Sequence, residues 1–195
     1  HGFTGNKEDG LDVGYRLAKA GMLCVLIDAY RHGERLEAPM DNLDHPDRRY
    51  IYPQGSGFDT YFVMLECALQ TARDIETLIN YFDGDPRVDT ARAGVTGFSM
   101  GGFATYFCAA NCPRVSAAAP MGAVVDLPRR WRDLIVEASV YEAWTAAMDG
   151  LAEENERRAG WMADIDPAEK MLRGYRKPLF ILHGELDTDS PKAYS

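Results

Sequence analysis

The stretch "ARAGVTGFSMGG", residues 91–102, decides the fold class. Its first eight residues read as a short buried β-strand, and the small and apolar residues from Met100 onward begin a helix. Between the two lies the pattern G-x-S-x-G, at residues 97–101. A strand, a tight turn and a helix in this order lift the hydroxyl of Ser99 above a sheet and aim backbone N–H groups at negative charge. The alternative interpretation is a glycine-rich turn that only joins a strand to a helix.

The segments on either side alternate between strand and helix patterns. Short apolar runs predict strands at 22–28, 91–98, 115–122 and 177–184. Apolar residues at helical spacing predict helices at 6–21, 60–82, 100–111 and 126–172. In the first helix, Leu11, Tyr15 and Ala18 form the apolar face and Gly21 is the stop signal. Such alternation is typical of an α/β protein with a mainly parallel sheet.

Length and charge narrow the classes of protein to which the chain can belong. A chain of 195 residues suits one domain with a sizeable core. The net charge of −9 argues against a nucleic-acid or anionic-membrane surface, because binding phosphate needs clustered Lys and Arg. No apolar run approaches the roughly 20 residues that span a bilayer. We therefore expect a cytoplasmic protein that binds neither nucleic acid nor membrane.

The four cysteines are interpreted as small buried apolar side chains in a reducing compartment. Cys24 lies in a predicted strand and Cys67 in a predicted helix. Cys108 and Cys112 share one helical face, which is the spacing of a metal pair. A zinc site needs two further ligands, and the sequence offers none at a suitable spacing. We expect neither a metal nor a cofactor.

Three motifs in a fixed order carry a resemblance to a known family: "HGF" at 1–3, "GFSMGG" at 97–102 and "HGELD" at 183–187. With them, the chain resembles the α/β-hydrolase superfamily over nearly its whole length. It looks most like the serine-esterase branch related to dienelactone hydrolases and the catalytic domains of prolyl oligopeptidases. The resemblance implies an α/β-hydrolase fold, with a mainly parallel sheet flanked by helices. Residues 1–195 would form a single, partial domain that contains a small helical cap insertion at 126–172.

The same resemblance assigns roles to residues of the three motifs. Ser99 would be the nucleophile and Asp187 the acid of a catalytic triad, with Asp189 as the alternative acid. The backbone N–H groups of Phe3 and Met100 would form the oxyanion hole. His1 would hold the first loop in place and would not act as the base.

No histidine of this sequence stands where the family's catalytic base is expected. A triad of this fold runs Ser, then Asp or Glu, then His, but all four histidines precede Asp187. We therefore expect a fragment that lacks the first strands, the last strand and helix, and the triad histidine. A strand missing between 22–28 and 91–98 would leave a gap of about 10 Å in the sheet. The other interpretation is that His32 or His45 serves as a substitute base.

The function that these motifs predict is hydrolysis of a small carboxylic ester through an acyl-enzyme. A peptidase of the prolyl oligopeptidase type and a thioesterase use the same triad and remain alternatives. A binding protein that has lost its histidine is the non-catalytic alternative. The oligomeric state stays open.

Two insertions are expected above the carboxyl edge of the sheet, where ligands bind in open α/β folds. One is the loop 31–59, whose aromatic residues are Tyr50, Tyr52 and Phe58. The other is the helical segment 126–172. Its aromatic and sulfur-containing side chains could line an acyl pocket, but packing of the cap on the sheet is the preferred interpretation; they are Trp131, Trp144, Trp161 and Met148. Arg129, Arg130 and Arg132 are expected on a solvated face.

Overall fold

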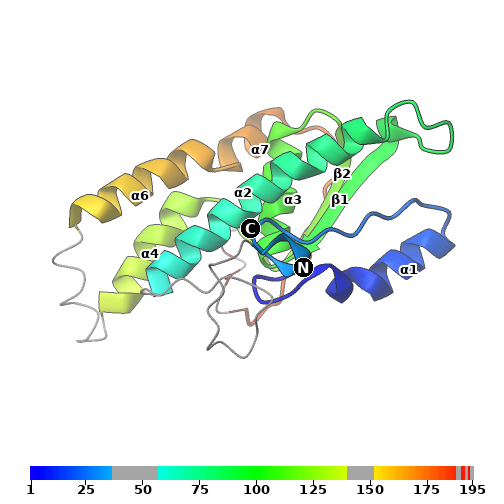
Figure 1. The fold of residues 1–195 in the computed structure, drawn as a ribbon. Coiled ribbons are helices and arrows are strands. Elements are labelled where there is room, and N and C mark those ends of the chain that lie inside the picture. Colours follow the sequence, from blue (N-terminus) through cyan, green and yellow to red (C-terminus); the bar gives the residue numbers. More distant parts are fainter. Residues whose placement is uncertain (37–56, 140–151, 188–189, 192, 194–195) are drawn as a thin grey trace.

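The structure, a computed structural model, describes residues 1–36, 57–139, 152–187, 190, 191 and 193 (Figure 1). Its elements in chain order are η1 (Lys7–Gly10), α1 (Leu11–Lys19), η2 (Gly33–Arg35), α2 (Gly57–Tyr81), η3 (Thr90–Arg92), β1 (Ala93–Phe98), α3 (Met100–Asn111), β2 (Val115–Met121), α4 (Leu127–Ser139), α6 (Ala152–Ile165) and α7 (Ala168–Gly174). The strands predicted at 91–98 and 115–122 and the helices predicted at 60–82 and 100–111 are therefore confirmed.

A parallel sheet carries the elements that follow the serine motif. Strands β1 and β2 pair in parallel, with Phe98 opposite Met121. The segment 178–182 continues the sheet on the far side of β2, because the Phe180 N–H donates to the carbonyl oxygen of Ala118 at 3.0 Å and the Leu182 N–H donates to that of Pro120 at 3.1 Å. The carboxyl ends of all three segments thus lie at one edge of the sheet, as a mainly parallel α/β fold requires.

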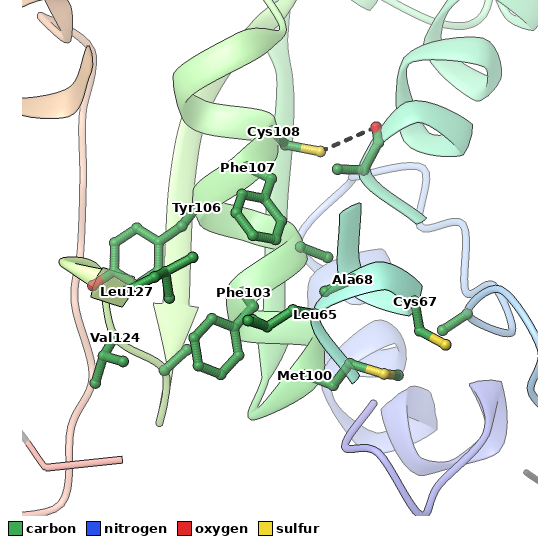
Figure 2. Close-up of a cluster of buried hydrophobic side chains, with 14 of the residues drawn as sticks. Leu65, Cys67, Ala68, Met100, Phe103, Tyr106, Phe107, Cys108, Val124 and Leu127 are labelled. Atoms are coloured by element: carbon green, nitrogen blue, oxygen red, sulfur yellow. Dashed lines mark hydrogen bonds between the residues drawn. The ribbon is translucent and has the colours of Figure 1, made fainter. Parts of the chain in front are cut away.

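The core lies between helices α2 and α3 and the face of the sheet that they cover (Figure 2). Helix α3 is apolar around most of its circumference because it packs against both strands and against α2. Leu65 of α2 lies beside Phe103 of α3 in this layer, and both side chains are buried. The opposite face of β1 is exposed, including the side chain of Phe98.

The strand predicted at 22–28 does not form a strand in the described part of the chain. The segment is extended, but no ladder of backbone hydrogen bonds joins it to another described segment. The side chains of Leu23 and Val25 are about half exposed. The prediction of a strand buried on both faces was wrong for these residues, because an apolar run acquires strand pairing and burial only where neighbouring segments supply them.

Helix α1 packs in a way that its apolar pattern did not predict. The expected apolar face is exposed, at 58% for Leu11 and 64% for Tyr15. The helix instead meets the extended segment through small residues, since a side chain added at Gly10 or Gly14 would lie against Leu26.

The end of α1 follows the prediction that Gly21 stops the helix. Gly21 adopts a φ of +88°, which a side chain would strain. The Gly21 N–H donates to the carbonyl oxygen of Ala18, and the Met22 N–H donates to that of Leu17. This pair of bonds is a Schellman motif, which satisfies carbonyl groups that the helix end leaves unpaired.

The helices of the predicted cap extend alongside the first half of α2 (Figure 1). Trp131 of α4 is buried and stacks on Tyr61, with ring centroids 6.4 Å apart. Trp161 of α6 contacts Phe62 at 4.3 Å between centroids. These two tryptophans therefore pack α4 and α6 on α2, whereas the preferred sequence interpretation placed this packing on the sheet. Outside the described residues lie Trp144, Met148, Tyr50 and Tyr52, together with the side chain of Phe58.

One of the three arginines of α4 departs from the sequence prediction. Arg129 and Arg132 are exposed, but Arg130 is only 3% exposed. Its charge lies near Tyr61, and burial raises the pKa of that phenol while the Arg130 charge opposes the shift. Arg130 is buried because it lies on the face of α4 that is turned toward α2 and away from solvent.

The cysteines are free thiols, and three of them lie in the core. Burial raises the pKa of Cys67 to about 11 and also raises that of Cys108, whose thiol donates to the carbonyl oxygen of Ala72 at 3.4 Å (Figure 2). Cys24 is half-buried and lies in the extended segment, so its predicted burial was wrong. Among the described residues, no group of three or more His, Cys, Asp or Glu side chains could hold a metal ion. No helix in the described ranges is long and apolar enough to cross a membrane.

Truncation of a core leucine tests the packing of α2 on α3. Leu65→Ala should lower the free energy of unfolding by about 2–5 kcal/mol, because Leu65 is 0% exposed and the cavity would have few ways to close. The matched control is Leu172→Ala in α7, where the side chain is 82% exposed and the expected change is within about 0.5 kcal/mol. Urea unfolding of the full-length protein measures both, and equal losses would contradict the described core.

Candidate functional site at the carboxyl edge of the sheet

Ser99 occupies a strained turn between β1 and α3. Its φ of 54° and ψ of −114° lie in a region that residues with side chains rarely adopt. The turn is fixed from both sides, because the Ser99 N–H donates to the carbonyl oxygen of Met121 at 2.9 Å and the Phe103 N–H donates to that of Ser99 at 3.0 Å. The Ser99 side chain makes no capping hydrogen bond to α3. The residue is half-buried at the carboxyl edge of the sheet.

The glycines around Ser99 are required by close approach of backbone segments. A Cβ atom at Gly97 would lie 2.4 Å from the carbonyl oxygen of Gly101. A Cβ atom at Gly102 would lie 2.6 Å from the carbonyl oxygen of Met121. Both distances are shorter than atoms tolerate, and the opposing atoms are backbone atoms that cannot swing aside. The motif G-x-S-x-G-G therefore describes a place where strand, turn and helix meet without room for side chains.

The first loop of the chain lies directly against this turn. The Gly101 N–H donates to the carbonyl oxygen of His1 at 3.0 Å. A Cβ atom at Gly2 would lie 3.8 Å from the Cβ atom of Ser99. Phe3, the next residue, packs against the core, and Met100 is buried at the start of α3. The structure thus brings the "HGF" loop and the serine motif together, although they lie almost 100 residues apart in the sequence.

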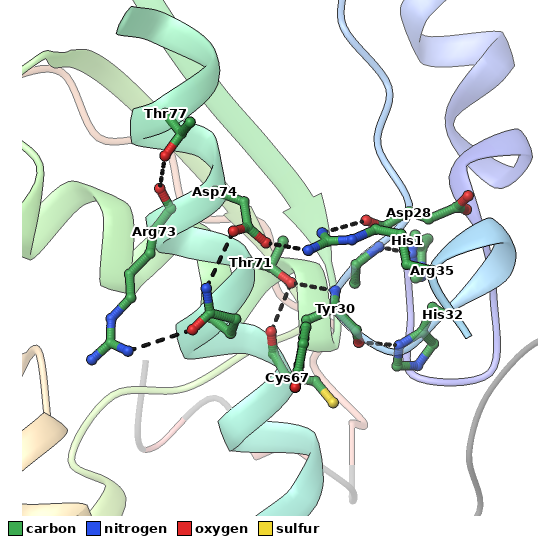
Figure 3. A network of polar contacts seen from close by, with 12 residues as sticks. His1, Asp28, Tyr30, His32, Arg35, Cys67, Thr71, Arg73, Asp74 and Thr77 are labelled. Carbon is green, nitrogen blue, oxygen red and sulfur yellow. Dashed lines mark hydrogen bonds and ion pairs between the residues drawn. The ribbon is translucent and has the colours of Figure 1, made fainter. Parts of the chain in front are cut away.

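Two histidines tie this loop to the segment that precedes η2 (Figure 3). The Ala29 N–H donates to Nε2 of His1 at 2.8 Å, which leaves the ring proton on Nδ1 to donate to the carbonyl oxygen of Gly2 at 2.8 Å. His32 is buried and its Nε2 lies 2.6 Å from the carbonyl oxygen of Phe3. Its Nδ1 lies 2.8 Å from the carbonyl oxygen of Tyr30, so the described contacts of the His32 nitrogens are with backbone and not with Ser99.

Asp187 reaches the same edge of the sheet from the segment 178–182. Its Oδ1 accepts a hydrogen bond from the Ser190 N–H at 2.8 Å, and its Oδ2 lies 3.7 Å from Nε2 of His183. A Cβ atom at Gly122 would lie 3.8 Å from Oδ2 of Asp187. Gly122 directly follows Met121, whose carbonyl oxygen accepts the Ser99 N–H, so Asp187 and Ser99 lie at the same edge of the sheet, on either side of the end of β2. Asp189 and His45 lie outside the described residues.

Asp28 is a residue of this region that the sequence reasoning did not single out. It is 5% exposed, and its carboxylate accepts the Lys7 N–H at 2.8 Å and the Glu34 N–H at 3.1 Å. Its Oδ2 also lies 3.2 Å from the Lys7 ammonium. Burial alone would raise the pKa of Asp28, but these donors stabilise the carboxylate and the pKa is lowered. The signal in the sequence was an acidic residue at the end of an apolar run, which rarely stays buried without partners.

Comparison with solved structures identifies the architecture. The chain is similar to the crystal structure of acetyl xylan esterase 1 from Thermoanaerobacterium sp. JW/SL YS485, with a TM-score of 0.52 and 22% sequence identity. The match covers 98% of this chain and 59% of that chain. At this identity the likeness concerns the fold, and the fold predicted from the sequence, the α/β-hydrolase fold, is confirmed.

Comparison with curated sequences adds a bacterial relative. The protein of Bacillus subtilis (strain 168) named "Putative esterase YitV" is 34% identical over 106 residues. The aligned stretch covers 54% of this chain and 35% of the relative, so the chain spans about a third of that protein's length.

The match to a protein family covers the serine motif, the helices α4, α6 and α7 and the segment that ends in Asp187. The sequence model described as the prolyl oligopeptidase family matches residues 61–194, which is more than half of the chain. The chain belongs to the prolyl oligopeptidase family, on an α/β-hydrolase fold.

Proposed function

We propose that the protein is a serine hydrolase that cleaves carboxylic esters through an acyl-enzyme. The observation that carries the proposal is the strained turn at Ser99, which has a positive φ and the "HGF" loop packed against it. Backbone strain of this kind is retained where a function needs it. The names of the bacterial relative, a putative esterase, and of the solved structure, an acetyl xylan esterase, support ester cleavage over other acyl transfers.

In the proposed mechanism, the Ser99 hydroxyl attacks the ester carbonyl carbon while a histidine accepts its proton. The carbonyl oxygen becomes an oxyanion, which the backbone N–H groups of Phe3 and Met100 stabilise by hydrogen bonds. Expulsion of the alcohol, which takes a proton from the histidine, leaves an acyl group on Ser99. Water then attacks the acyl carbon while the histidine accepts a proton from it; the histidine returns this proton to the Ser99 oxygen as the carboxylic acid leaves.

Asp187 is proposed to orient the histidine and to stabilise its positive charge. The carboxylate lies beside Gly122 at the edge that also carries Ser99, which is the position such a residue needs. The histidine itself is proposed to come from residues of the full-length protein beyond this sequence. His32 is a poorer candidate, because both ring nitrogens already face carbonyl oxygens.

A serine peptidase is the second candidate, and the family match favours it specifically. The same nucleophile and oxyanion donors serve amide and ester cleavage, so the substrate distinguishes the two. A panel of nitrophenyl esters and of short peptides, given to the full-length protein, measures the difference. Ester cleavage that exceeds peptide cleavage by orders of magnitude in kcat/KM is the expected result.

Replacing the nucleophile tests the proposed mechanism directly. Ser99→Ala should lower kcat for a nitrophenyl ester by about 10⁶-fold while the protein stays folded, because no other group can form the acyl-enzyme. It should also abolish covalent labelling by a fluorophosphonate, measured by intact mass.

The matched control is Ser116→Ala in β2, where the hydroxyl donates to the carbonyl oxygen of Ala93 at 2.9 Å. This variant should keep both activity and labelling. Hydrolysis or labelling that survives in Ser99→Ala would refute the assignment.

Replacing the proposed acid distinguishes Asp187 from Asp189. Asp187→Asn should lower kcat by about 10⁴-fold, because an amide cannot hold the histidine in the required tautomer. Asp189→Asn is the matched control and should leave kcat within a few-fold of the unmodified protein. Steady-state kinetics with one nitrophenyl ester decides, and the reverse ranking would move the role to Asp189.

A further inference from the structure

The segment that carries His32 is fastened to α2 by side-chain hydrogen bonds (Figure 3). The Tyr30 N–H donates to Oγ1 of Thr71 at 3.0 Å, and the Thr71 hydroxyl donates to the carbonyl oxygen of Cys67 at 2.6 Å. The Arg35 guanidinium pairs with Asp74 at 2.8 Å. Because a helix in the core is rigid, these bonds fix the position of the His32 segment relative to the sheet.

The His32 ring lies between its own segment, which is bonded to α2, and the first loop. It is 1% exposed, and its centroid lies 5.2 Å from that of His1 and 5.4 Å from that of Phe3. Nε2 is 2.6 Å from the carbonyl oxygen of Phe3, a short contact for a nitrogen donor. The ring therefore packs beside the side chains of His1 and Phe3 and contacts the carbonyl oxygen of Phe3 through Nε2.

Both ring nitrogens of His32 face carbonyl oxygens, which only accept hydrogen bonds. Burial lowers the pKa of His32, although the two carbonyl groups oppose this, so the ring is neutral and has one N–H at neutral pH. We place that proton on Nε2, whose contact is the shorter of the two. Protonation at lower pH would add a bond from Nδ1 to Tyr30 and would keep the bond to Phe3.

We propose that His32 is a positioning residue for the oxyanion hole, because its Nε2–H binds the carbonyl oxygen of Phe3 and thereby holds the first loop, which contacts the turn at Ser99 through His1 and Gly2. This inference rests on the proposed function, in which the Phe3 N–H stabilises the oxyanion. It assigns to His32 a structural link from α2 to the reacting atoms, in place of the role of substitute base.

The expected loss of rate follows from how precisely the N–H donors must be placed relative to the oxyanion. Donors in such a site have to hold their geometry within about 0.5 Å, and a misplacement of about 1 Å costs on the order of 10²-fold in rate. An oxyanion donor acts in the transition state and not on the bound ester, so its displacement lowers kcat and leaves KM nearly unchanged.

Two amide substitutions in the full-length protein separate the two ring nitrogens. Glutamine is long enough to place an N–H donor near the position of Nε2, whereas asparagine reaches only the position of Nδ1. We expect His32→Asn to lower kcat for a nitrophenyl ester by about tenfold or more with KM within about twofold. His32→Gln should retain kcat within about threefold. Thermal unfolding of both variants checks that they share one fold.

A second measurement does not depend on activity. Hydrogen exchange of the peptide that contains residues 1–7 should be faster in His32→Asn than in the unmodified protein and in His32→Gln. If the two variants show equal kcat and equal exchange, or if asparagine is the better substitute, the positioning role is overturned while the proposed function stands. If the unmodified protein cleaves no ester, the proposed function fails, and the exchange rates still decide whether His32 holds the loop.

Discussion

The structure depends on one steric constraint: three backbone segments meet at the turn around Ser99, where no side chain fits. Gly97 approaches Gly101, and Gly102 approaches the end of β2. The carbonyl oxygen of His1 takes a hydrogen bond from the same turn. Since each contact is between backbone atoms, strand, helix and first loop cannot shift independently, and the positive φ of Ser99 follows from the way they are joined. The chemistry proposed for the site uses this rigidity.

A network of polar contacts holds the first loop in position. Polar groups hold it: the Asp28 carboxylate accepts hydrogen bonds from the N–H groups of Lys7 and Glu34. His1 and His32 connect the first loop to the segment that precedes η2. Burial makes such bonds stronger than at a surface, and it also makes an unmatched partner costly. The polar network and the apolar core meet at α2, since Thr71 lies on the same helix as Leu65.

Sequence reasoning predicted the central elements well, because a strand–turn–helix motif and an apolar helix are local patterns. It predicted the bounds of α3 from the local pattern, and the closeness of the first loop to Ser99 from a family resemblance. It was wrong about the segment 22–28 and about the buried face of α1, because burial there depends on segments far away in the chain. The contacts of Asp28 and His32 could not be predicted, since they are hydrogen bonds to backbone groups that no side-chain pattern marks.

The distribution of the cysteines has a practical consequence. Three thiols lie in the core, and a raised pKa keeps Cys67 and Cys108 protonated at neutral pH, a state in which sulfur is a poor nucleophile. Cys24 alone among the four is accessible to reagents from solvent. Among residues 1–195, a maleimide dye would thus attach at Cys24, so its fluorescence would report on the surroundings of the extended segment.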